Sequence, residues 1–403
     1  MTEHSTEICI VGAGAAGLWA AAVCARSGKD TLVLEKTSRT GSKVLSSGGS
    51  RCNLTTTLDA DQAARHFGQA HDFIRPALRA LTPQQVRARI EALGVATKVE
   101  VEFEKVFPAS DSALQVRNAL ERDAREAGAR FLVSSQVQGI EPTEGGWVAT
   151  LPQGRVCCRR LLLCTGGKSY PRTGTTGDGY PWLRSLGLKV VDPVPALVPL
   201  ASPAPWVREL TGITVDGELR IGKRRRRRPV LFTHKGLSGP GPMDLSDAVT
   251  RDGLREARLD LLPDTSWEEL RDLLVSAAGR SGSPALASVL PLPRRLVEAV
   301  ARQAGLSELN PRVNQIPKAA RHRLIDELKG LHIPISGSLG FEKAEVTAGG
   351  LDLSQVHRTT MEVKRCPGLY VFGELLDLTG PIGGFNFQAA FSTAELAARA
   401  ACA

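Results

Sequence analysis

The most specific chemical signal in the chain is a glycine motif near its N-terminus. Gly12, Gly14 and Gly17 follow an apolar run at residues 7–11 and open an alanine-rich stretch. In a strand–turn–helix unit, the first glycine permits a tight turn, the second lets the backbone approach a pyrophosphate, and the third lets the helix pack closely. Glu35 ends a second apolar run, where its carboxylate can accept hydrogen bonds from a ribose. The spacing predicts a bound dinucleotide.

Two later segments favour FAD over NAD. Residues 161–167 read as an apolar strand that runs into Thr165-Gly166-Gly167, and residues 368–374 as a strand that ends in Gly373-Glu374. They resemble the second and third nucleotide-contact segments of flavoproteins with two dinucleotide-binding domains. No second complete glycine motif is present, so no separate nicotinamide domain is expected. The seven histidines lack metal-ligand spacing, and no metal is assigned.

Composition limits the class of protein. The 403 residues are 42% apolar and 23% charged, which suits two or three folded domains and excludes a disordered or fibrous chain. The net charge is +9, and residues 223–228 are six consecutive cations, so the excess of positive charge is local. Eight cysteines without a CxxC pair, and an N-terminus without a signal-peptide pattern, predict a cytoplasmic protein with reduced thiols.

The elements that must position these residues follow from turn and capping signals. Helix starts are expected after Thr82, Ser112, Ser266 and Ser392, each followed three residues later by Gln or Glu. Residues 131–133 and 147–149 read as strands of a small sheet. Prolines crowd residues 193–205 and mark a domain crossing.

The expected fold is α/β, with a Rossmann-type FAD-binding domain of the two-dinucleotide-domain flavoprotein type. An inserted β-barrel-like and helical part splits that domain. The boundaries are residues 1–190 for the first part of the FAD-binding domain, 191–262 for the β-rich insertion, 263–334 for its helical part, and 335–403 for the second part.

Seven ordered motifs resemble the BaiN/RdsA (YhiN-like) family of FAD-dependent oxidoreductases. They are GAGAAGL at 12–18, SSGGSRCNLT at 46–55, VFPAS at 106–110, TGGKSYPRTGTTGDGY at 165–180, PALVPL at 195–200, LFTHKGLSGP at 231–240 and GLYVFGELLDLTGPIGGFNFQAA at 368–390. Ser50 stands where the family usually has glycine. The resemblance implies a split FAD domain and reduction of conjugated or ring double bonds. Family members act on uridine in large-subunit ribosomal RNA or on small steroid-like or amine substrates.

The motifs and the resemblance together give the expected FAD-binding residues. They are Gly12, Gly14, Ala15, Ala16, Gly17, Glu35, Lys36, Lys43, Ser47, Gly48, Arg51, Cys52, Asn53, Val137, Thr165, Gly166, Gly167, Gly373, Glu374, Gly383, Gly384, Phe385 and Asn386. Gly383, Gly384 and Asn386 precede a helical run whose N–H groups would stabilise negative charge on the reduced flavin.

Reducing the C5–C6 bond of uracil needs hydride at C6 and a proton at C5. Cys52 is the leading candidate acid because neighbouring Arg51 could tune its thiol; the alternative is a small buried hydrophobe. His234, before a Gly-Leu-Ser-Gly-Pro turn, is a second catalytic candidate or else a structural histidine.

The cation run reads as the tip of a β-hairpin. Arg224, Arg225, Arg226, Arg227 and Arg228 would engage RNA phosphates, or else form a solvated tip. The leading interpretation is an FAD enzyme that reduces uridine to dihydrouridine in ribosomal RNA, with NAD(P)H as a transient reductant and no membrane partner. The alternatives are a small-molecule oxidase or enone reductase, and a flavin-containing RNA-binding protein without turnover.

Overall fold

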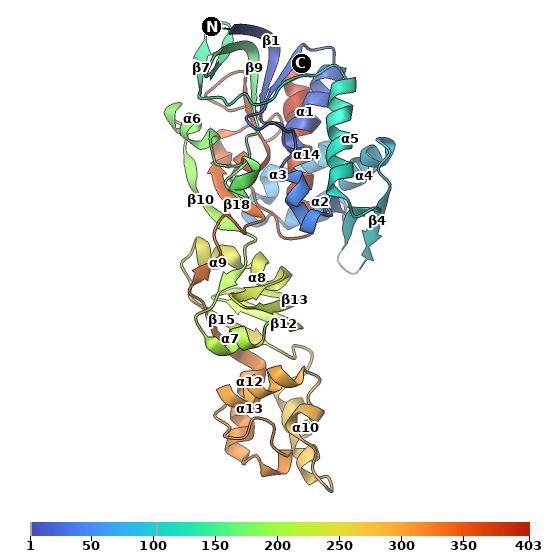
Figure 1. The fold of residues 1–403 in the computed structure, drawn as a ribbon, viewed down its shortest axis with the longest axis vertical. Coiled ribbons are helices and arrows are strands. Elements are labelled where there is room, and N and C mark those ends of the chain that lie inside the picture. The colour runs from blue at the N-terminus through green and yellow to red at the C-terminus, as the bar shows by residue number, and fades with distance from the viewer. Residues whose placement is uncertain (1, 102–103) are drawn as a thin grey trace. The chain divides into compact units, whose positions relative to one another are not determined.

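The computed structural model describes residues 2–101 and 104–403, which form two compact units (Figure 1). The split unit comprises the chain up to Val194 together with Glu345–Ala403, and the inserted unit is Pro195–Ala344. The border at Val194 lies in the proline-rich segment that the sequence marks as a domain crossing. The finer division of the insertion at residue 262 stays a prediction.

A seven-stranded sheet forms the centre of the split unit. Its parallel strands are β6 (Arg130–Leu132), β2 (Thr31–Leu34), β1 (Thr2–Val11), β9 (Gly154–Leu163) and β19 (Leu369–Val371). The antiparallel strands β8 (Gly146–Leu151) and β7 (Gly139–Thr143) extend it beyond β9. The fold class is therefore confirmed as Rossmann-type α/β. The expected small sheet is wrong, since residues 131–132 pair with β2 and residues 147–149 with β9.

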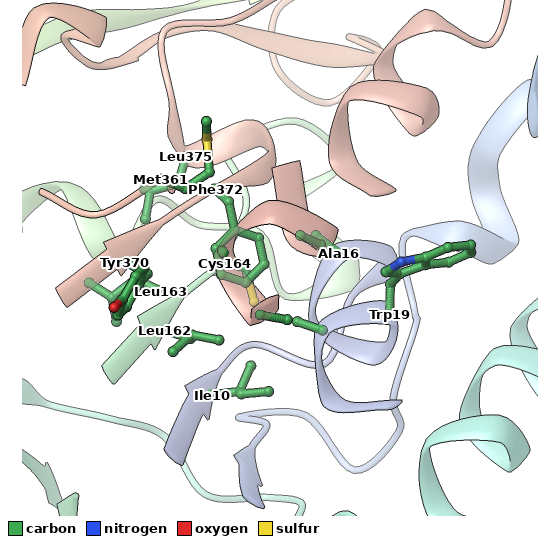
Figure 2. Packing of buried hydrophobic residues seen from close by; sticks show 14 of the residues in the cluster. Ile10, Ala16, Trp19, Leu162, Leu163, Cys164, Met361, Tyr370, Phe372 and Leu375 are labelled. Carbon is green, nitrogen blue, oxygen red and sulfur yellow. The ribbon is translucent and has the colours of Figure 1, made fainter. Parts of the chain in front are cut away.

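Helices α1 (Ala15–Arg26), α5 (Ala113–Glu126) and α14 (Phe385–Cys402) pack together in this unit. The rings of Trp19 and Phe391 lie 4.8 Å apart, and Trp19 Nε1 donates to Glu395 at 2.6 Å. Buried side chains from β1, β9, α1 and the segment around β19 meet in one core, with Cys164 and Phe372 in their midst (Figure 2). This packing seats the start of α1 against the ends of the parallel strands.

The capping signals succeed where local contacts suffice. Thr82 and Ser266 form full capping boxes at the starts of α4 (Pro83–Ala92) and α10 (Trp267–Gly279). Ser112 caps α5 through Gln115 N, but the Gln115 side chain accepts from Ser110 instead. The expected start at Ser392 is wrong: α14 begins at Phe385, and the buried Ser392 hydroxyl donates to Leu81 O at 2.8 Å.

The split unit also carries short helices and a three-stranded sheet. The helices are α2 (Ala60–Arg65), α3 (His71–Ala80) and α6 (Gly179–Ser185), and the strands are β3 (Thr55–Thr56), β5 (Lys105–Pro108) and β4 (Thr97–Glu100). A two-stranded sheet joins β10 (Val190–Ala196) to β18 (Val346–Leu351).

The inserted unit contains a seven-stranded antiparallel sheet and helices. In spatial order its strands are β16 (Leu331–Pro334), β15 (Glu256–Asp260), β12 (Thr214–Ile221), β13 (Arg224–Thr233), β14 (Gly236–Ser238), β11 (Leu200–Ala201) and β17 (Gly337–Ser338). Besides α10, its helices are α7 (Pro205–Glu209), α8 (Pro240–Asp244), α9 (Ser246–Thr250), α11 (Leu286–Val289), α12 (Arg294–Gln303) and α13 (Lys318–Gly330). None of the helices described is long and apolar enough to cross a membrane.

Candidate functional site

The three motif glycines have different surroundings, which match three different roles. A Cβ atom on Gly12, where φ is +108°, would lie 2.6 Å from Cys164 O, and one on Gly17 would lie 1.9 Å from Gly12 O. Glycine is required at both positions because another segment of the main chain lies too close to leave room for a side chain. A Cβ on Gly14 would have no described chain atom within 4 Å. The space beside Gly14 is therefore open to a group that approaches from outside the chain, as the motif predicts for a pyrophosphate.

The start of α1 is free of competing side chains. Gly14 caps the helix without a side-chain hydrogen bond, and the first turn carries no acidic residue. The first N–H groups of a helix have no intrahelical acceptor, so those of Ala15, Ala16 and Gly17 are available to an anion. This geometry fits a pyrophosphate.

Glu35 lies directly beside this turn. One carboxylate oxygen accepts from Ala13 N at 2.9 Å, and the other from Thr37 N and Thr37 Oγ1 at 2.8 Å. The carboxylate is thereby fixed next to the glycine turn and retains lone pairs for ribose hydroxyls. Lys36 pairs with Asp178 at 2.6 Å, and Val137 is buried in the core of the same unit; their contact with a cofactor stays a prediction.

Residues 47–53 follow an unusual backbone path. Gly48, Gly49, Ser50 and Cys52 all have left-handed φ values between 53° and 69°. A left-handed conformation costs a residue with a side chain about 1–2 kcal/mol. The departure at Ser50 thus falls on a position whose backbone favours glycine. Ser47 holds the loop locally, with its hydroxyl donating to Val44 O at 2.6 Å.

The side chains that flank Cys52 fasten this loop to its neighbours. Arg51 pairs with Glu100 at 2.5 Å and Asp111 at 2.7 Å. The Asn53 amide, oriented so that both its groups are satisfied, accepts from Gly384 N at 2.9 Å and donates to the main chain of β3 and β5. Asn53 therefore brings the loop and the start of α14 together.

Cys52 has no exposed surface, and burial raises the pKa of its thiol to about 12. The expectation that Arg51 tunes this thiol is wrong, because the guanidinium is engaged by two carboxylates and does not act on the Cys52 pKa. The thiol keeps its proton at neutral pH, as an acid must, but it lies in the core rather than on a surface. Both interpretations of Cys52, as the proton donor and as a small buried hydrophobic residue, therefore retain support.

A polar cluster joins four segments that are distant in the sequence. Lys43 Nζ contacts the Glu374 carboxylate and Ser169 Oγ, and the Ser169 hydroxyl donates to Glu374 Oε1 at 2.9 Å. Thr347 N in β18 also donates to Glu374 Oε1, at 2.8 Å, and the Thr347 hydroxyl accepts from Lys168 N at 2.7 Å. The structure therefore brings together two predicted residues, Lys43 and Glu374.

Ser169 and Thr347 were missed by the sequence reasoning. Ser169 belongs to the motif at 165–180. There the tripeptide Gly167-Lys168-Ser169 resembles only the end of a P-loop whose first glycine is missing, so the sequence gives Ser169 no role. Thr347 lies in no recognisable motif, and its role depends on the return of the chain after the insertion.

The Thr165-Gly166-Gly167 turn lies next to this cluster. A Cβ on Gly167 would lie 2.3 Å from Thr347 Oγ1, so the turn and β18 pack closely. The buried Thr165 hydroxyl has no hydrogen-bond partner among the residues that the structure describes. A buried hydroxyl usually has a partner, and a ligand with polar groups would supply one.

The start of α14 offers a second anion-binding helix end. Gly384 caps it without a side chain, its first turn has no acidic residue, and a Cβ on Gly384 would lie 2.3 Å from Thr55 O. Phe385 stacks on His66 at 4.5 Å between ring centroids, and Asn386 binds the Gly380 main chain through both amide groups at 2.9 Å. These two side chains hold the turn. Gly384 N already donates to Asn53, so the main chain of Gly383 and the N–H groups of the first turn of α14 remain the part suited to a cofactor.

These features fit FAD. The open approach at Gly14, the uncapped starts of α1 and α14, the fixed Glu35 carboxylate and the unsatisfied Thr165 hydroxyl are the donors and acceptors that a dinucleotide needs. Gly373, whose N–H donates to Thr393 Oγ1 at 3.1 Å, follows β19 within the same unit.

The remaining predicted residues lie in the inserted unit. His234 is exposed in the turn between β13 and β14. The expected hairpin tip of arginines is wrong: the turn is Gly222-Lys223, and Arg224–Arg228 already belong to β13, paired with β12. Apolar residues at alternate positions of β12 and further along β13 are buried. Their packing extends the β12–β13 pairing through the arginine run. Within residues 2–101 and 104–403, no cluster of His, Cys, Asp and Glu suits a metal.

Comparison with known proteins adds independent evidence. The family model described as the HI0933-like protein Rossmann domain matches residues 6–400. A ribosomal RNA dihydrouridine synthase of Escherichia coli (strain K12) is 32% identical over 391 residues, which are 96% of this chain and 95% of that protein. A 3-dehydro-bile acid delta(4,6)-reductase of Clostridium scindens is 29% identical over 409 residues, 98% of each chain.

Solved structures show the same fold at greater distance. The 3-ketosteroid delta1-dehydrogenase from Sterolibacterium denitrificans, in complex with 1,4-androstadiene-3,17-dione, aligns with a TM-score of 0.52 and 14% identity over 99% of each chain. At this identity the likeness concerns the fold alone.

Proposed function

Because this chain belongs to the HI0933-like Rossmann family, we propose that it is an FAD-dependent reductase that converts uridine to dihydrouridine in ribosomal RNA. The observation that carries the proposal is the end-to-end similarity to a ribosomal RNA dihydrouridine synthase, at 32% identity. The Gly14 approach and the uncapped helix starts support the cofactor. With ribosomal RNA as substrate, the enzyme would work in the cytoplasm.

When bound, the flavin would supply hydride for C6 of the uracil ring, with NAD(P)H as the proposed source of its electrons. The chain's own residues bind and orient. The N–H groups at the start of α1 would hold the pyrophosphate and Glu35 would bind the ribose. The N–H groups that follow Gly383 and Gly384 at the start of α14 would favour negative charge on the reduced ring. Lys43 and Glu374 fix the turn after β19 against the polar cluster.

The proton for C5 has two candidate donors, Cys52 and His234. Cys52 holds its proton at neutral pH, and its loop is fastened to the start of α14 through Asn53. His234 is exposed and lies in the inserted unit. Turnover that falls in Cys52→Ala but not in His234→Gln, with flavin retained in both, selects Cys52; the reverse selects His234.

The decisive experiment compares ribosomal RNA from a gene-deletion strain and its parent. RNA digested to nucleosides is analysed for dihydrouridine by mass spectrometry. We expect one modification to disappear and to return with the wild-type gene. Unchanged dihydrouridine in a strain whose parent expresses the gene contradicts the proposal.

A second candidate is reduction of a carbon–carbon double bond in a small steroid-like enone. The similarity to a 3-dehydro-bile acid delta(4,6)-reductase favours it. Flavin reoxidation by such an enone, with no effect of the gene on ribosomal RNA, would establish this alternative. Flavin that NAD(P)H does not reduce, in a protein that binds RNA, would indicate the third interpretation, an RNA-binding protein without turnover.

A further inference from the structure

Strand β13 divides the arginine run between two faces of its sheet. Successive side chains of a strand point to opposite faces. On the face toward α8 and α9, Arg224 pairs with Asp247 and Asp252 at the edge of the unit's buried core. Arg228, on the same face, pairs with Asp244 at 3.1 Å. These two cations are already compensated within the protein.

On the opposite face, register aligns basic residues from four strands. Arg220 of β12 lies opposite Arg225 of β13 on one side and opposite Arg258 of β15 on the other. Arg258 in turn lies opposite His332 of β16. We call these four residues the basic row. The three arginines are exposed, whereas the next residues along the strands, Leu219 and Leu259, are buried.

The basic row differs from the row beside it. There, Arg227 of β13 lies opposite Glu218 of β12, Glu218 lies opposite Asp260, and further ion pairs join Arg227 to Asp264 and Asp260 to Lys329. That row balances its charge with neighbouring side chains.

In the basic row, the nearest carboxylates are more distant or absent. Arg225 reaches Glu218 only at 3.9 Å, and His332 reaches Glu256 only at 3.8 Å. Arg220 and Arg258 have no carboxylate within 4.0 Å in the described part of the chain; they donate to the carbonyls of Gly222 and Gly330. Like charges directly opposite each other destabilise a sheet, and an anion laid across them removes that cost.

We propose that the basic row binds the phosphate backbone of the RNA, which rests on the proposed function. Neighbouring strands lie about 4.8 Å apart, so the three guanidinium groups extend across about 10 Å, more than a single phosphate occupies. Guanidinium groups donate in pairs to phosphate oxygens. The three guanidinium groups face phosphates rather than base edges, so the row positions the RNA without reading its sequence.

The test measures binding of fluorescein-labelled oligouridylate by the full-length, flavin-loaded protein over a range of salt concentrations. The variant Arg220→Gln/Arg258→Gln removes the two uncompensated cations of the row. Its matched control, Arg280→Gln/Arg295→Gln, removes two exposed cations of the same unit, one directly after α10 and one in α12, where Arg295 likewise donates to a carbonyl, that of Glu209. Flavin content and melting temperature establish that both variants fold.

We expect the row variant to bind about 25-fold more weakly at 0.1 M salt. The slope of log affinity against log salt should fall by about 1.4, since each lost phosphate contact on a single strand contributes about 0.7. The control should retain the wild-type slope. Equal affinity and slope in the row variant and wild type overturn the proposal, as does an equal loss in the control.

Two further measurements separate this inference from its premise. Dihydrouridine in the bound oligonucleotide, or in ribosomal RNA, tests the function; a row-dependent slope without dihydrouridine supports the row and contradicts the function. Dihydrouridine formation with an unchanged slope in the row variant supports the function and contradicts the basic row as an RNA-binding surface. Row-dependent binding to phosphatidylserine vesicles in place of RNA overturns the proposal in favour of a membrane surface.

Discussion

The Lys43 ammonium group forms an ion pair with the Glu374 carboxylate, although the two residues belong to the two parts of the chain that flank the insertion. Both side chains are about one-fifth exposed. Ser169 and Thr347 complete the cluster, so the contact fixes the turn after β19 to the segment after β2 and to β18. One ion pair thus helps to close a nucleotide-binding unit whose sequence is interrupted.

Replacing Glu374 by Gln tests this closure. The substitution leaves a partly buried ammonium group without its counter-charge, and we expect the free energy of unfolding to fall by about 2 kcal/mol. Chemical denaturation of the flavin-free protein measures that loss. The double variant Lys43→Met/Glu374→Gln should recover part of it. A single variant as stable as wild type would show that the pair contributes nothing to closure.

The motif glycines give a matched pair of variants. A Cβ at Gly14 meets no described chain atom, so Gly14→Ala should leave the melting temperature of the flavin-free protein unchanged but weaken FAD binding at least about tenfold. A Cβ at Gly17 would lie 1.9 Å from Gly12 O, so Gly17→Ala should lower the stability of the flavin-free protein itself. Calorimetry and flavin titration separate the two effects. Normal FAD affinity in Gly14→Ala would remove this glycine from the pyrophosphate site.

The cysteines should differ sharply in reactivity. All eight are free, and burial raises the pKa of Cys52 to about 12. A hydrogen bond from the Cys24 thiol lowers the pKa of the partly exposed Cys402 to about 7. The thiolate is the reactive form, so iodoacetamide at pH 8 should alkylate Cys402 first and leave Cys52 unmodified in the folded protein.

Peptide mapping after timed alkylation reads both sites. Cys157 is a useful internal control, since it is also partly exposed but burial and Glu3 raise its pKa. Alkylation of Cys52 at the rate of Cys402 would show that the loop at residues 47–53 opens in solution.

Stability should depend on pH through Asp352. Lys189 at 2.6 Å and the hydrogen bonds from Ser354 lower the pKa of this carboxyl to about 2, below its value of about 3.9 in an unfolded chain. A lowered pKa stabilises the fold above the unfolded value, and the gain is lost as the pH falls from about 4 through about 2.

The matching variant is Asp352→Asn. At pH 7 it should be less stable than wild type by about 1 kcal/mol, and the difference should vanish near pH 2. Urea denaturation at several pH values measures it. A difference that persists unchanged at pH 2 would contradict the assigned ion pair.

Features that depend on neighbours in sequence were determined by the sequence itself. The glycine spacing and the apolar run before it specify the turn from β1 into α1, because steric limits and helix-end N–H groups act within a few residues. Thr82 and Ser266 specify helix starts for the same reason. The expected helix start at Ser392 is wrong because a serine is also accommodated inside a helix when its hydroxyl donates to a buried carbonyl, here Leu81 O.

Tertiary structure alone decided the features that depend on distant segments. The burial that holds the Cys52 proton, the role of Thr347 beside Glu374, and the alignment of Arg220 with Arg258 each need chain segments that meet only after folding. Strand register has a period of two, so a shift by one residue would turn Arg220 to the other face. The sequence shows six adjacent cations, but the pairing and faces of the sheet decide which of them form ion pairs within the protein and which can bind a partner.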